Sequence, residues 1–494
     1  MPYSHYDRLS AMDSAFLDLE DGNVHMHIGS IGIFDAEPLQ NEDGGMDFDR
    51  VIELVAAAVR KNVRFQQRIS YVPALKQPVW VDDEKFNLRY HVRHTSLPAP
   101  GSERLLKRLT GRIMSEELDR GKALWEMWFV EGVEGNRFAI ISKIHHSVVD
   151  GISAVDLLSA IVDRDPGGRP KPPGAWIPRP APSGVRLLAD DLMRRAEVPL
   201  SLVRGGVSAL SSPGKTIGAV RDAALGLGQA AKAGLVPASE TPFNEPLGPH
   251  RRCDWTRFEL EDLKQVRKRS GGALNDVVLA IVSGAIRRFF INRGFRVEGL
   301  DFRALVPVNL RGAEVGTFSS RVSTLLAPLP LDEADPLLRL RKVVEAMREL
   351  KQSKQRKGGD LVAEVADWTF TGLMLAFARF GLNNRAANMV VTNVPGPRRT
   401  VHLLGARMRE VYPMVPLGPN QTLGVALFSY DGGLYWGFNS DWDVLPDLHD
   451  FIEAVEQEFE EICEAAGEAS TSPKAAEAKG GEAASAAGSA RSAS

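Results

Sequence analysis

An apolar run that ends in two histidines is the feature that most constrains how this chain can fold. Residues 138–144 are apolar at five of seven positions, which is typical of a buried β-strand. The seven residues 145–151 follow directly and read His-His-Ser-Val-Val-Asp-Gly. Apolar residues then recur at helical spacing after Ser153, which predicts a helix there. The histidines are therefore expected on a strand-to-helix turn, where side chains can face a cleft.

The histidines in this turn have the chemistry needed to move protons. Histidine changes charge near neutral pH, so it can accept a proton from an alcohol and later give it to a leaving group. His146 is the candidate proton acceptor, because it has the spacing to Asp150 and Gly151 lets the backbone turn afterwards. Neighbouring strand residues point to opposite faces, so His145 is expected to have a supporting structural role. A hydrogen-bonded core histidine is the alternative for His146.

A metal site is another interpretation of two histidines followed by an aspartate. The chain has two cysteines, Cys253 and Cys463, and no other compact cluster of ligand residues stands out in the sequence. We therefore expect no metal and no other cofactor. The spacing of the cysteines does not exclude a disulfide, but so few cysteines without a signal peptide favour a reduced, cytoplasmic protein.

Length and composition limit the fold and the partners. The chain has 494 residues, too many for one core, so two domains are expected. Hydrophobic residues make up 44% and charged residues 25%, as in globular proteins that function in water. The 60 basic and 63 acidic residues leave a formal charge of −3, and no basic run suggests a nucleic-acid partner. No apolar stretch is long enough to span a membrane, so any membrane contact is expected at the surface.

Changes in composition divide the chain into four segments. Residues 1–165 and 250–466 both mix strand and helix patterns, and each is predicted to form a subdomain. Residues 166–249 begin with a proline-rich stretch and continue with apolar clusters and arginines, which predicts a linker with a helical crossover. A packed helix is the favoured interpretation of 171–240, and an interfacial helix that contacts lipid is the alternative. Residues 467–494 are rich in Ala, Gly, Ser and Glu and are expected to be disordered, without a catalytic role.

Local patterns in the second half predict four further features. They are a helix over 274–289, a strand at 303–311, a strand running into a tight turn at 389–397, and a hairpin that joins 423–430 to 434–438 through Asp431-Gly432-Gly433.

Further sequence segments accompany the histidine motif in a fixed order. They are Arg8–Leu17, His25–Gly29, Leu118–Arg120, Leu124–Glu126, Asn275–Ala280, Pro307–Arg311 and Asn393–Pro397. Together they resemble the bacterial wax ester synthase/diacylglycerol acyltransferase family, over the whole folded length. The histidine motif alone is less specific, because peptide condensation domains carry it too. The chain departs from the family pattern at Ala123, where proline is usual, and at Ser319-Ser320, where Gly-Asn is frequent.

The resemblance implies a fold and an activity. The fold would be α/β, with two related subdomains, each a mixed β-sheet flanked by helices, joined by the helical crossover linker. The catalytic histidine would lie at their junction, in a tunnel open to acyl-CoA at one end and to the acceptor at the other. The activity would be transfer of a long-chain acyl group from CoA, which is a substrate rather than a cofactor. The product would be triacylglycerol from diacylglycerol, wax ester from a long-chain alcohol, or both, without an acyl-enzyme.

The resemblance also suggests roles for several other residues. Asp150 is expected to hold the turn, often through an ion pair with an arginine that the sequence does not identify. Asn275 is a candidate polar group near the oxyanion. Asn275 and Asp276 are also strong helix-capping residues, which is at least as good an interpretation. Trp125 and Asn393 are candidates for the tunnel wall, although a tryptophan at such a position is more often a core residue and a tight turn needs residues such as Asn393 in any case.

Two other functions stay open at this point. A condensation-type transferase would receive its acyl group from a carrier protein, although the chain contains no obvious carrier or adenylation segment. An acyl-CoA- or lipid-binding protein without turnover would belong to a different class, and the intact histidine motif argues against it. Oily substrates would also explain an association with a membrane or lipid-droplet surface.

Overall fold

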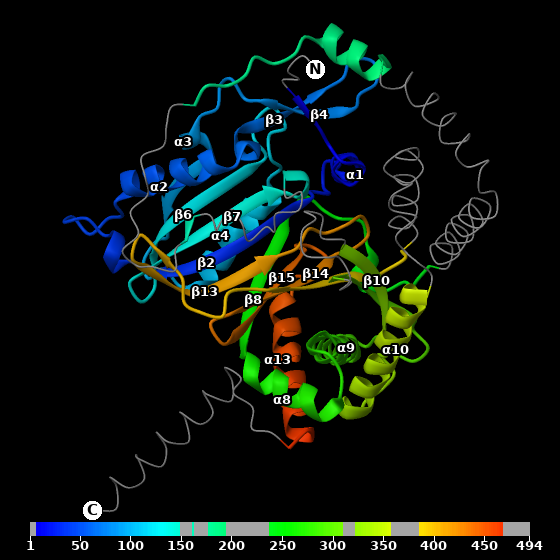
Figure 1. Ribbon diagram of the computed structural model, residues 1–494. Coiled ribbons are helices and arrows are strands. Elements are labelled where there is room, and N and C mark those ends of the chain that lie inside the picture. Colours follow the sequence, from blue (N-terminus) through cyan, green and yellow to red (C-terminus); the bar gives the residue numbers. More distant parts are fainter. Residues whose placement is uncertain are drawn as a thin grey trace, which may run out of the picture.

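The computed structural model describes residues 6–148, 161–162, 176–193, 237–309, 322–356 and 385–467. Within these ranges the chain forms two six-stranded mixed sheets and one three-stranded sheet, with helices packed against them (Figure 1). Most of the predicted helix after Ser153, most of the predicted crossover and all but the first residue of the predicted tail lie outside the described residues.

The N-terminal sheet has the strand order β12-β13-β2-β7-β6-β5. Its strands are β12 (His402–Leu403), β13 (Ala406–Met414), β2 (His27–Asp35), β7 (Arg137–His145), β6 (Trp125–Val133) and β5 (Val92–Ser96). β5 runs parallel to β6, and the other neighbours are antiparallel. β7 is buried at every residue except Arg137, which confirms the strand predicted at 138–144.

Helices and a small sheet complete the N-terminal half. The helices are α1 (Ala11–Leu19), α2 (Phe48–Lys61), α3 (Leu88–His91) and α4 (Glu103–Ser115), with short 3-10 turns η1 (Glu37–Leu39), η2 (Val63–Gln66) and η3 (His146–Val148). The small sheet is formed by β1 (Tyr6–Arg8), β4 (Pro78–Asp82) and β3 (Gln67–Tyr71). α2 is amphipathic and places Val51, Val55 and Val59 in the core of this half, because these residues recur every four positions along the helix.

The C-terminal sheet has the order β10-β9-β11-β14-β15-β8. Its strands are β8 (Arg251–Glu259), β9 (Phe302–Asn309), β10 (Val322–Leu329), β11 (Met389–Pro395), β14 (Leu423–Tyr430) and β15 (Gly433–Asp441). β14 and β15 form the predicted hairpin, with a turn of Asp431 and Gly432. Both turn residues have positive φ, as a type I′ turn requires, and Gly433 pairs with Tyr430, so it belongs to the strand rather than to the turn.

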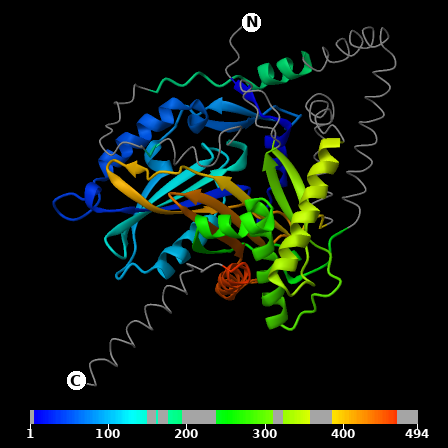
Figure 2. The same cartoon turned by 60° about the horizontal axis from the view of Figure 1, so that its bottom comes forward.

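Four helices gather on one side of the C-terminal sheet (Figures 1 and 2). They are α8 (Leu260–Ser270), α9 (Leu274–Asn292), α10 (Pro336–Arg356) and α13 (Leu448–Ala465), and the turn η4 (Pro242–Asn244) precedes β8. α9 is the central helix: it contacts the other three, and every residue from Val277 to Ile286 is buried. A helix that is apolar all round is expected in such a position.

One strand crosses between the two halves. β13 lies between β11 and β14 in the chain, but it pairs with β2 of the N-terminal sheet. It also contacts the C-terminal hairpin, where the hydroxyl of Tyr430 donates to the carbonyl oxygen of Met408 at 2.9 Å. A side chain at Gly437 would overlap the backbone of Pro413, so this close approach requires glycine. The crossing strand therefore ties the sheets together.

β8, which comes first along the chain among the strands of the C-terminal sheet, packs on α4. Lys107, Gly111 and Ser115 of α4 are spaced by four residues and so lie on one face of the helix. The Lys107 amine lies 2.5 Å from Asp254 Oδ1 of β8, and the Ser115 hydroxyl accepts the backbone N–H of Arg251 at 2.8 Å. A Cβ at Gly111 would lie 2.8 Å from the Arg251 carbonyl oxygen, so a small residue is needed there.

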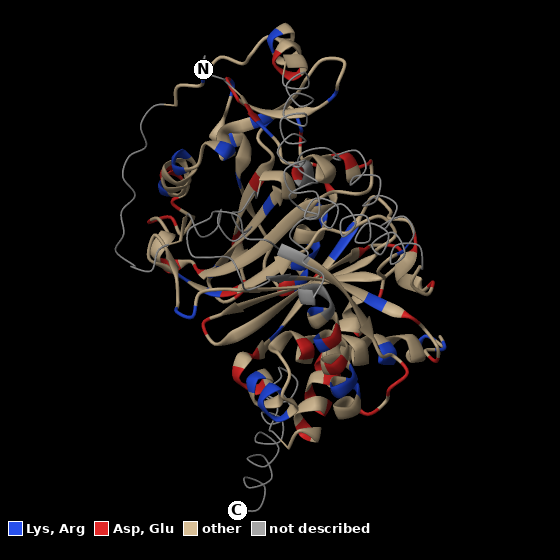
Figure 3. Cartoon of the chain, turned by 45° about the vertical axis from the view of Figure 1, so that its right-hand side comes forward, with Lys and Arg blue, Asp and Glu red and all other residues tan. Residues whose placement is uncertain are grey.

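The distribution of surface charge and the state of the two cysteines are ordinary for a globular protein. Basic and acidic residues are interspersed over the helices of the C-terminal half (Figure 3). Cys253 and Cys463 are both buried and free. In the described ranges, no helix combines the length and apolarity that crossing a bilayer would demand.

Candidate functional site

The two predicted histidines lie where β7 ends. His145 is the last residue of β7 and pairs with His27 of β2, while His146 begins the turn η3. α1 lies against this turn, and its Phe16 ring stacks on the His146 ring with a centroid distance of 3.9 Å. α1 is held at its start by Ser10, whose hydroxyl accepts a backbone N–H of the first turn. The motif thus sits between a sheet end and a capped helix.

The surroundings of His146 favour a neutral ring. Its backbone N–H donates to the Met26 carbonyl oxygen at 2.8 Å, and its side chain is half-buried. Burial is the main cause that lowers the pKa of His146 to about 4, and a hydrogen bond to its own carbonyl oxygen opposes this shift. At pH 7 the ring is therefore unprotonated and can accept a proton.

His145 has a different environment and is fully buried. Its Nδ1 atom accepts the backbone N–H of Ser147 at 3.1 Å and lies 2.6 Å from the Ser147 hydroxyl. Because Nδ1 accepts, the proton of the neutral ring must be on Nε2. That atom lies 3.2 Å from Oε1 of Glu20, at ion-pair distance although not in line for an ideal hydrogen bond.

Glu20 directly follows α1, and its carboxylate contacts several neighbouring residues. Its Oε1 accepts the Met26 backbone N–H at 2.9 Å and lies 3.6 Å from Nε2 of His27. Its Oε2 accepts Nη2 of Arg120 at 2.8 Å. Burial alone would raise the pKa of Glu20, but its close contacts with His145, His27 and Arg120 bring this pKa far below its usual range. Glu20 is therefore a carboxylate at neutral pH.

Sequence reasoning did not single out Glu20, His27 or Arg120 as site residues. His27 and Arg120 lie in segments that carry the family resemblance, so a signal for them was present. Glu20 follows an ordinary amphipathic helix and belongs to no motif. Only the fold shows that it reaches His145.

The structure brings Asn275 and Asn393 together. Asn393 of β11 donates through Nδ2 to Oδ1 of Asn275, in the first turn of α9, at 2.8 Å. Asp276, rather than Asn275, supports the helix start, because its Oδ2 accepts the backbone N–H of Ala273 at 2.8 Å. Burial raises the pKa of Asp276. The N-cap residue itself is Ala273, so neither Asn275 nor Asp276 is the cap, and the role of Asn275 near the oxyanion stays a prediction.

Trp125 lies at the start of β6 and is fully buried. Its Nε1 donates to the Phe65 carbonyl oxygen at 2.8 Å, and its ring stacks on His91 with a centroid distance of 4.8 Å. These contacts place it in the N-terminal core, and its role in a tunnel wall stays a prediction. Asp150 and Gly151 lie outside the described residues, so the arginine partner expected for Asp150 is not assigned.

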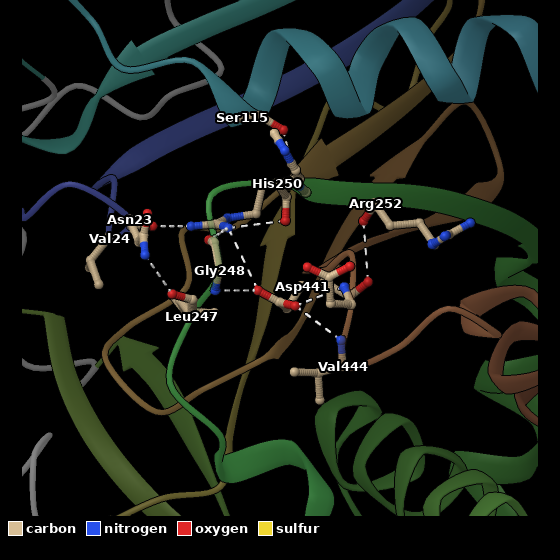
Figure 4. A network of polar contacts seen from close by, with 12 residues as sticks. Asn23, Val24, Ser115, Leu247, Gly248, His250, Arg252, Asp441 and Val444 are labelled. Carbon is tan, nitrogen blue, oxygen red and sulfur yellow. Dashed lines mark hydrogen bonds and ion pairs between the residues drawn. The ribbon is translucent and has the colours of Figure 1, made fainter.

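A polar network fixes the loop between α1 and β2 to the C-terminal half (Figure 4). Asn23 of this loop donates through Nδ2 to the Leu247 carbonyl oxygen at 2.9 Å, and its own carbonyl oxygen accepts Nη2 of Arg251. Arg251 is buried and also donates to the Gly248 carbonyl oxygen at 2.7 Å. Asp441 accepts the Gly248 backbone N–H at 2.7 Å. The loop that carries Met26 is thereby anchored from both halves.

Comparisons with known proteins identify the family. The wax ester synthase/diacylglycerol acyltransferase catalytic domain matches residues 9–278, and the WS/DGAT C-terminal domain matches residues 319–463. The chain is 31% identical over 472 residues to "Probable diacyglycerol O-acyltransferase tgs1" of Mycobacterium tuberculosis (strain CDC 1551 / Oshkosh), covering 91% of this chain and 94% of that protein.

Solved structures agree with this result. The wax ester synthase/diacylglycerol acyltransferase from Marinobacter aquaeolei VT8 matches with a TM-score of 0.65 and 27% identity, covering 93% of this chain and 100% of that one. The first condensation domain of the calcium-dependent antibiotic synthetase matches with a TM-score of 0.55 and 16% identity, covering 95% and 98%, which shows a shared fold. The chain therefore belongs to the wax ester synthase/diacylglycerol acyltransferase family and is an acyltransferase.

Proposed function

We propose that this protein transfers a long-chain fatty acyl group from CoA to a lipid hydroxyl, with His146 as the general base. The acceptor would be diacylglycerol, a long-chain alcohol, or both. The observation that carries the proposal is the neutral His146 ring, whose pKa is lowered to about 4, held by a backbone hydrogen bond and a stacked phenyl ring. A base must be unprotonated and positioned before it can act.

The proposed reaction is a direct transfer. His146 takes the proton of the acceptor hydroxyl while its oxygen attacks the thioester carbonyl carbon. The tetrahedral intermediate then collapses, the carbon–sulfur bond breaks, and the imidazolium protonates the departing CoA sulfur. An imidazolium with so low a pKa is a strong acid, so protonating a thiolate is downhill. No acyl-enzyme forms, and the scheme uses no metal or other cofactor.

Release of CoA from palmitoyl-CoA tests the proposal. Purified protein is offered dipalmitoylglycerol or hexadecanol beside His146→Ala, with His449→Ala as the control because its side chain is 69% exposed and lies on α13. We expect acceptor-dependent release that His146→Ala loses and His449→Ala retains. The better acceptor decides between triacylglycerol and wax ester. Folded protein that releases no CoA with either acceptor would argue for the carrier-fed or the binding-only alternative.

A single-turnover experiment tests the absence of an acyl-enzyme. The protein is mixed with radiolabelled palmitoyl-CoA without acceptor, quenched and denatured. We expect no label on the protein. Stable label at stoichiometric amounts would overturn direct transfer while leaving acyl transfer itself intact.

We also propose that the protein meets its oily substrates at a membrane or lipid-droplet surface. The support is a helix over residues 184–193, which buries Leu187 against the small three-stranded sheet. On its other side Val185 is 81% exposed and Leu192 is 53% exposed. These two residues are seven positions apart and share one helix face. Such an apolar face suits interfacial binding.

Flotation with lipid vesicles tests this localisation. The double variant Val185→Ser/Leu192→Ser should float less than the unchanged protein. The control is Ile291→Ser, which removes a side chain of 46% exposure in the C-terminal half. Equal flotation of the double variant and the control would contradict a role for this helix.

A further inference from the structure

A carboxylate beside the catalytic motif has no role in the proposed proton transfer. Glu20 is 11% exposed, and its Oε1 lies 3.2 Å from Nε2 of His145. We propose that Glu20 is a positioning residue for acyl transfer: it holds His145 in one tautomer and thereby fixes the turn that carries His146. This inference rests on the proposed role of His146 as the base.

The first step is the choice of tautomer. A neutral imidazole carries its proton on one nitrogen, and the other nitrogen accepts. The proton on Nε2 of His145 faces a carboxylate, whose negative charge favours it there. The opposite tautomer would turn a lone pair toward Glu20 and would lose this attraction. Glu20 therefore selects the Nε2–H form.

The second step links this tautomer to the turn. In the Nε2–H form, Nδ1 of His145 accepts the backbone N–H of Ser147 at 3.1 Å. In the Nδ1–H form, two donors would face each other at that place, and a buried N–H would lose its partner. His146 lies between the two bonded residues. Its ring direction therefore depends on the same hydrogen bond.

The third step is a second connection from Glu20 to His146, through two backbone hydrogen bonds of Met26. Oε1 of Glu20 also accepts the backbone N–H of Met26 at 2.9 Å. The carbonyl oxygen of Met26 in turn accepts the backbone N–H of His146 at 2.8 Å. One carboxylate oxygen thus supports the side chain of His145 and, through Met26, the backbone of His146.

The carboxylate itself is held in place. Nη2 of Arg120 donates to Oε2 of Glu20 at 2.8 Å and also to the Leu17 carbonyl oxygen at 2.6 Å. The following loop is tied to the C-terminal half through Asn23 and Arg251 (Figure 4). Glu20 is therefore fixed by contacts that do not involve the motif, as a positioning group must be.

Two substitutions separate the carboxylate's hydrogen-bonding role from its bulk. Glu20→Gln keeps an oxygen for His145 and Met26 but loses the ion pair with Arg120. Glu20→Leu keeps the volume and removes both oxygens. We expect Glu20→Leu to lower kcat about 100-fold with KM for palmitoyl-CoA within about twofold, because a misplaced base slows chemistry without weakening binding. Glu20→Gln should recover most of that loss.

The matched control is Glu126→Leu. Glu126 is a carboxylate of similar exposure, 8%, in the same half, but it pairs with Arg93 rather than with a motif histidine. We expect it to leave kcat within about threefold of the unchanged protein. Circular dichroism confirms that each variant is folded. A folded Glu20→Leu with unchanged kcat, or a Glu20→Gln as damaged as Glu20→Leu, would overturn the inference.

A ¹⁵N NMR spectrum of histidine-labelled protein tests the tautomer without turnover. The His145 signals are assigned by their loss in His145→Gln. We expect a protonated Nε2 and an unprotonated Nδ1 in the unchanged protein, and a mixed or reversed pattern in Glu20→Leu. A proton on Nδ1 in the unchanged protein would overturn the inference even if the variants do not fold. If the unchanged protein shows no acyl transfer, the proposed function fails, and this spectrum alone decides whether Glu20 sets the tautomer.

Discussion

The side chain of Asn393 donates a hydrogen bond of 2.8 Å to the side chain of Asn275. The two residues lie 118 positions apart in the chain, on β11 and at the start of α9. This bond orients the amide of Asn275, whose Nδ2 is a hydrogen-bond donor. A fixed donor is what an oxyanion needs for stabilisation.

Loss of either asparagine should therefore slow acyl transfer. We expect Asn275→Ala to lower kcat about 100-fold if its amide donates to the oxyanion. Asn393→Ala should have a smaller effect, about tenfold, because it only frees Asn275 to rotate. The double variant should be no worse than Asn275→Ala alone, since both act through one group. Additive losses in CoA-release assays would contradict this coupling.

The pH dependence of acyl transfer should lack an acid limb at the ordinary histidine pKa. Burial lowers the pKa of His146 from 6.5 to about 4. We therefore expect kcat/KM to stay flat as pH falls through 6.5 and to decline with an apparent pKa of about 4. An acid limb near 6.5 would contradict a desolvated base.

The same shift predicts how stability changes with pH. The unfolded chain binds a proton at the ordinary histidine pKa of 6.5, above that of the folded chain. Between pH 6.5 and about 4 the unfolded state therefore holds more protons at this histidine, and the free energy of unfolding falls as pH falls through that range. Circular dichroism at each pH separates loss of folded protein from protonation of His146.

Removing the phenyl ring on His146 should move the acid limb upward. Phe16→Ala lets water reach the imidazole, which reduces the desolvation that lowers its pKa. We expect the apparent pKa of kcat/KM to rise by at least about one unit toward the ordinary value. Phe48→Ala is the control, because Phe48 stacks on His94 with a centroid distance of 4.5 Å, away from the motif. Equal profiles for both variants would show that Phe16 does not desolvate the base.

The parts of the fold that the sequence could predict are those with a local cause. The strand at 138–144 and the hairpin of β14 and β15 have apolar runs and turn residues that define them without reference to the rest of the chain. β13 is different. No strand is predicted for residues 406–414, and packing between the halves pairs this strand with β2 of the N-terminal sheet. Local periodicity contains no information about that choice.

The candidate site also contains residues that a local motif predicts and residues that only long-range packing brings in. His145 and His146 could be found because their motif is contiguous. Glu20 could not, because its contact with His145 depends on how α1 lies against β7, which no spacing along the chain expresses. Asn275 and Asp276 were both plausible caps from residue type. In the structure Ala273 is the N-cap residue, Asp276 supports it from the N3 position, and Asn275 pairs with Asn393.

The central helix α9 should tolerate no side chain at Gly284. This glycine faces the buried ion pair between Arg339 of α10 and Glu458 of α13, and a Cβ there would overlap the Glu458 carboxylate. Burial raises the pKa of Glu458, and the charges of Arg339 and Arg288 oppose that rise. The pair is therefore costly to disturb, because displacing either partner leaves the other charge buried.

Gly284→Ala tests this packing by urea unfolding. Alanine gains about 1 kcal/mol of helix propensity over glycine, whereas overpacking a well-filled core costs about 1–3 kcal/mol. Because the added methyl group clashes with a charged pair, we expect the cost of overpacking to exceed the gain in helix propensity. The free energy of unfolding should fall by about 1–2 kcal/mol. Gly22→Ala is the control: its added Cβ would meet nothing within 4 Å. A midpoint that rises in Gly284→Ala would mean that α10 and α13 can move apart, and that the ion pair does not fix their distance from α9.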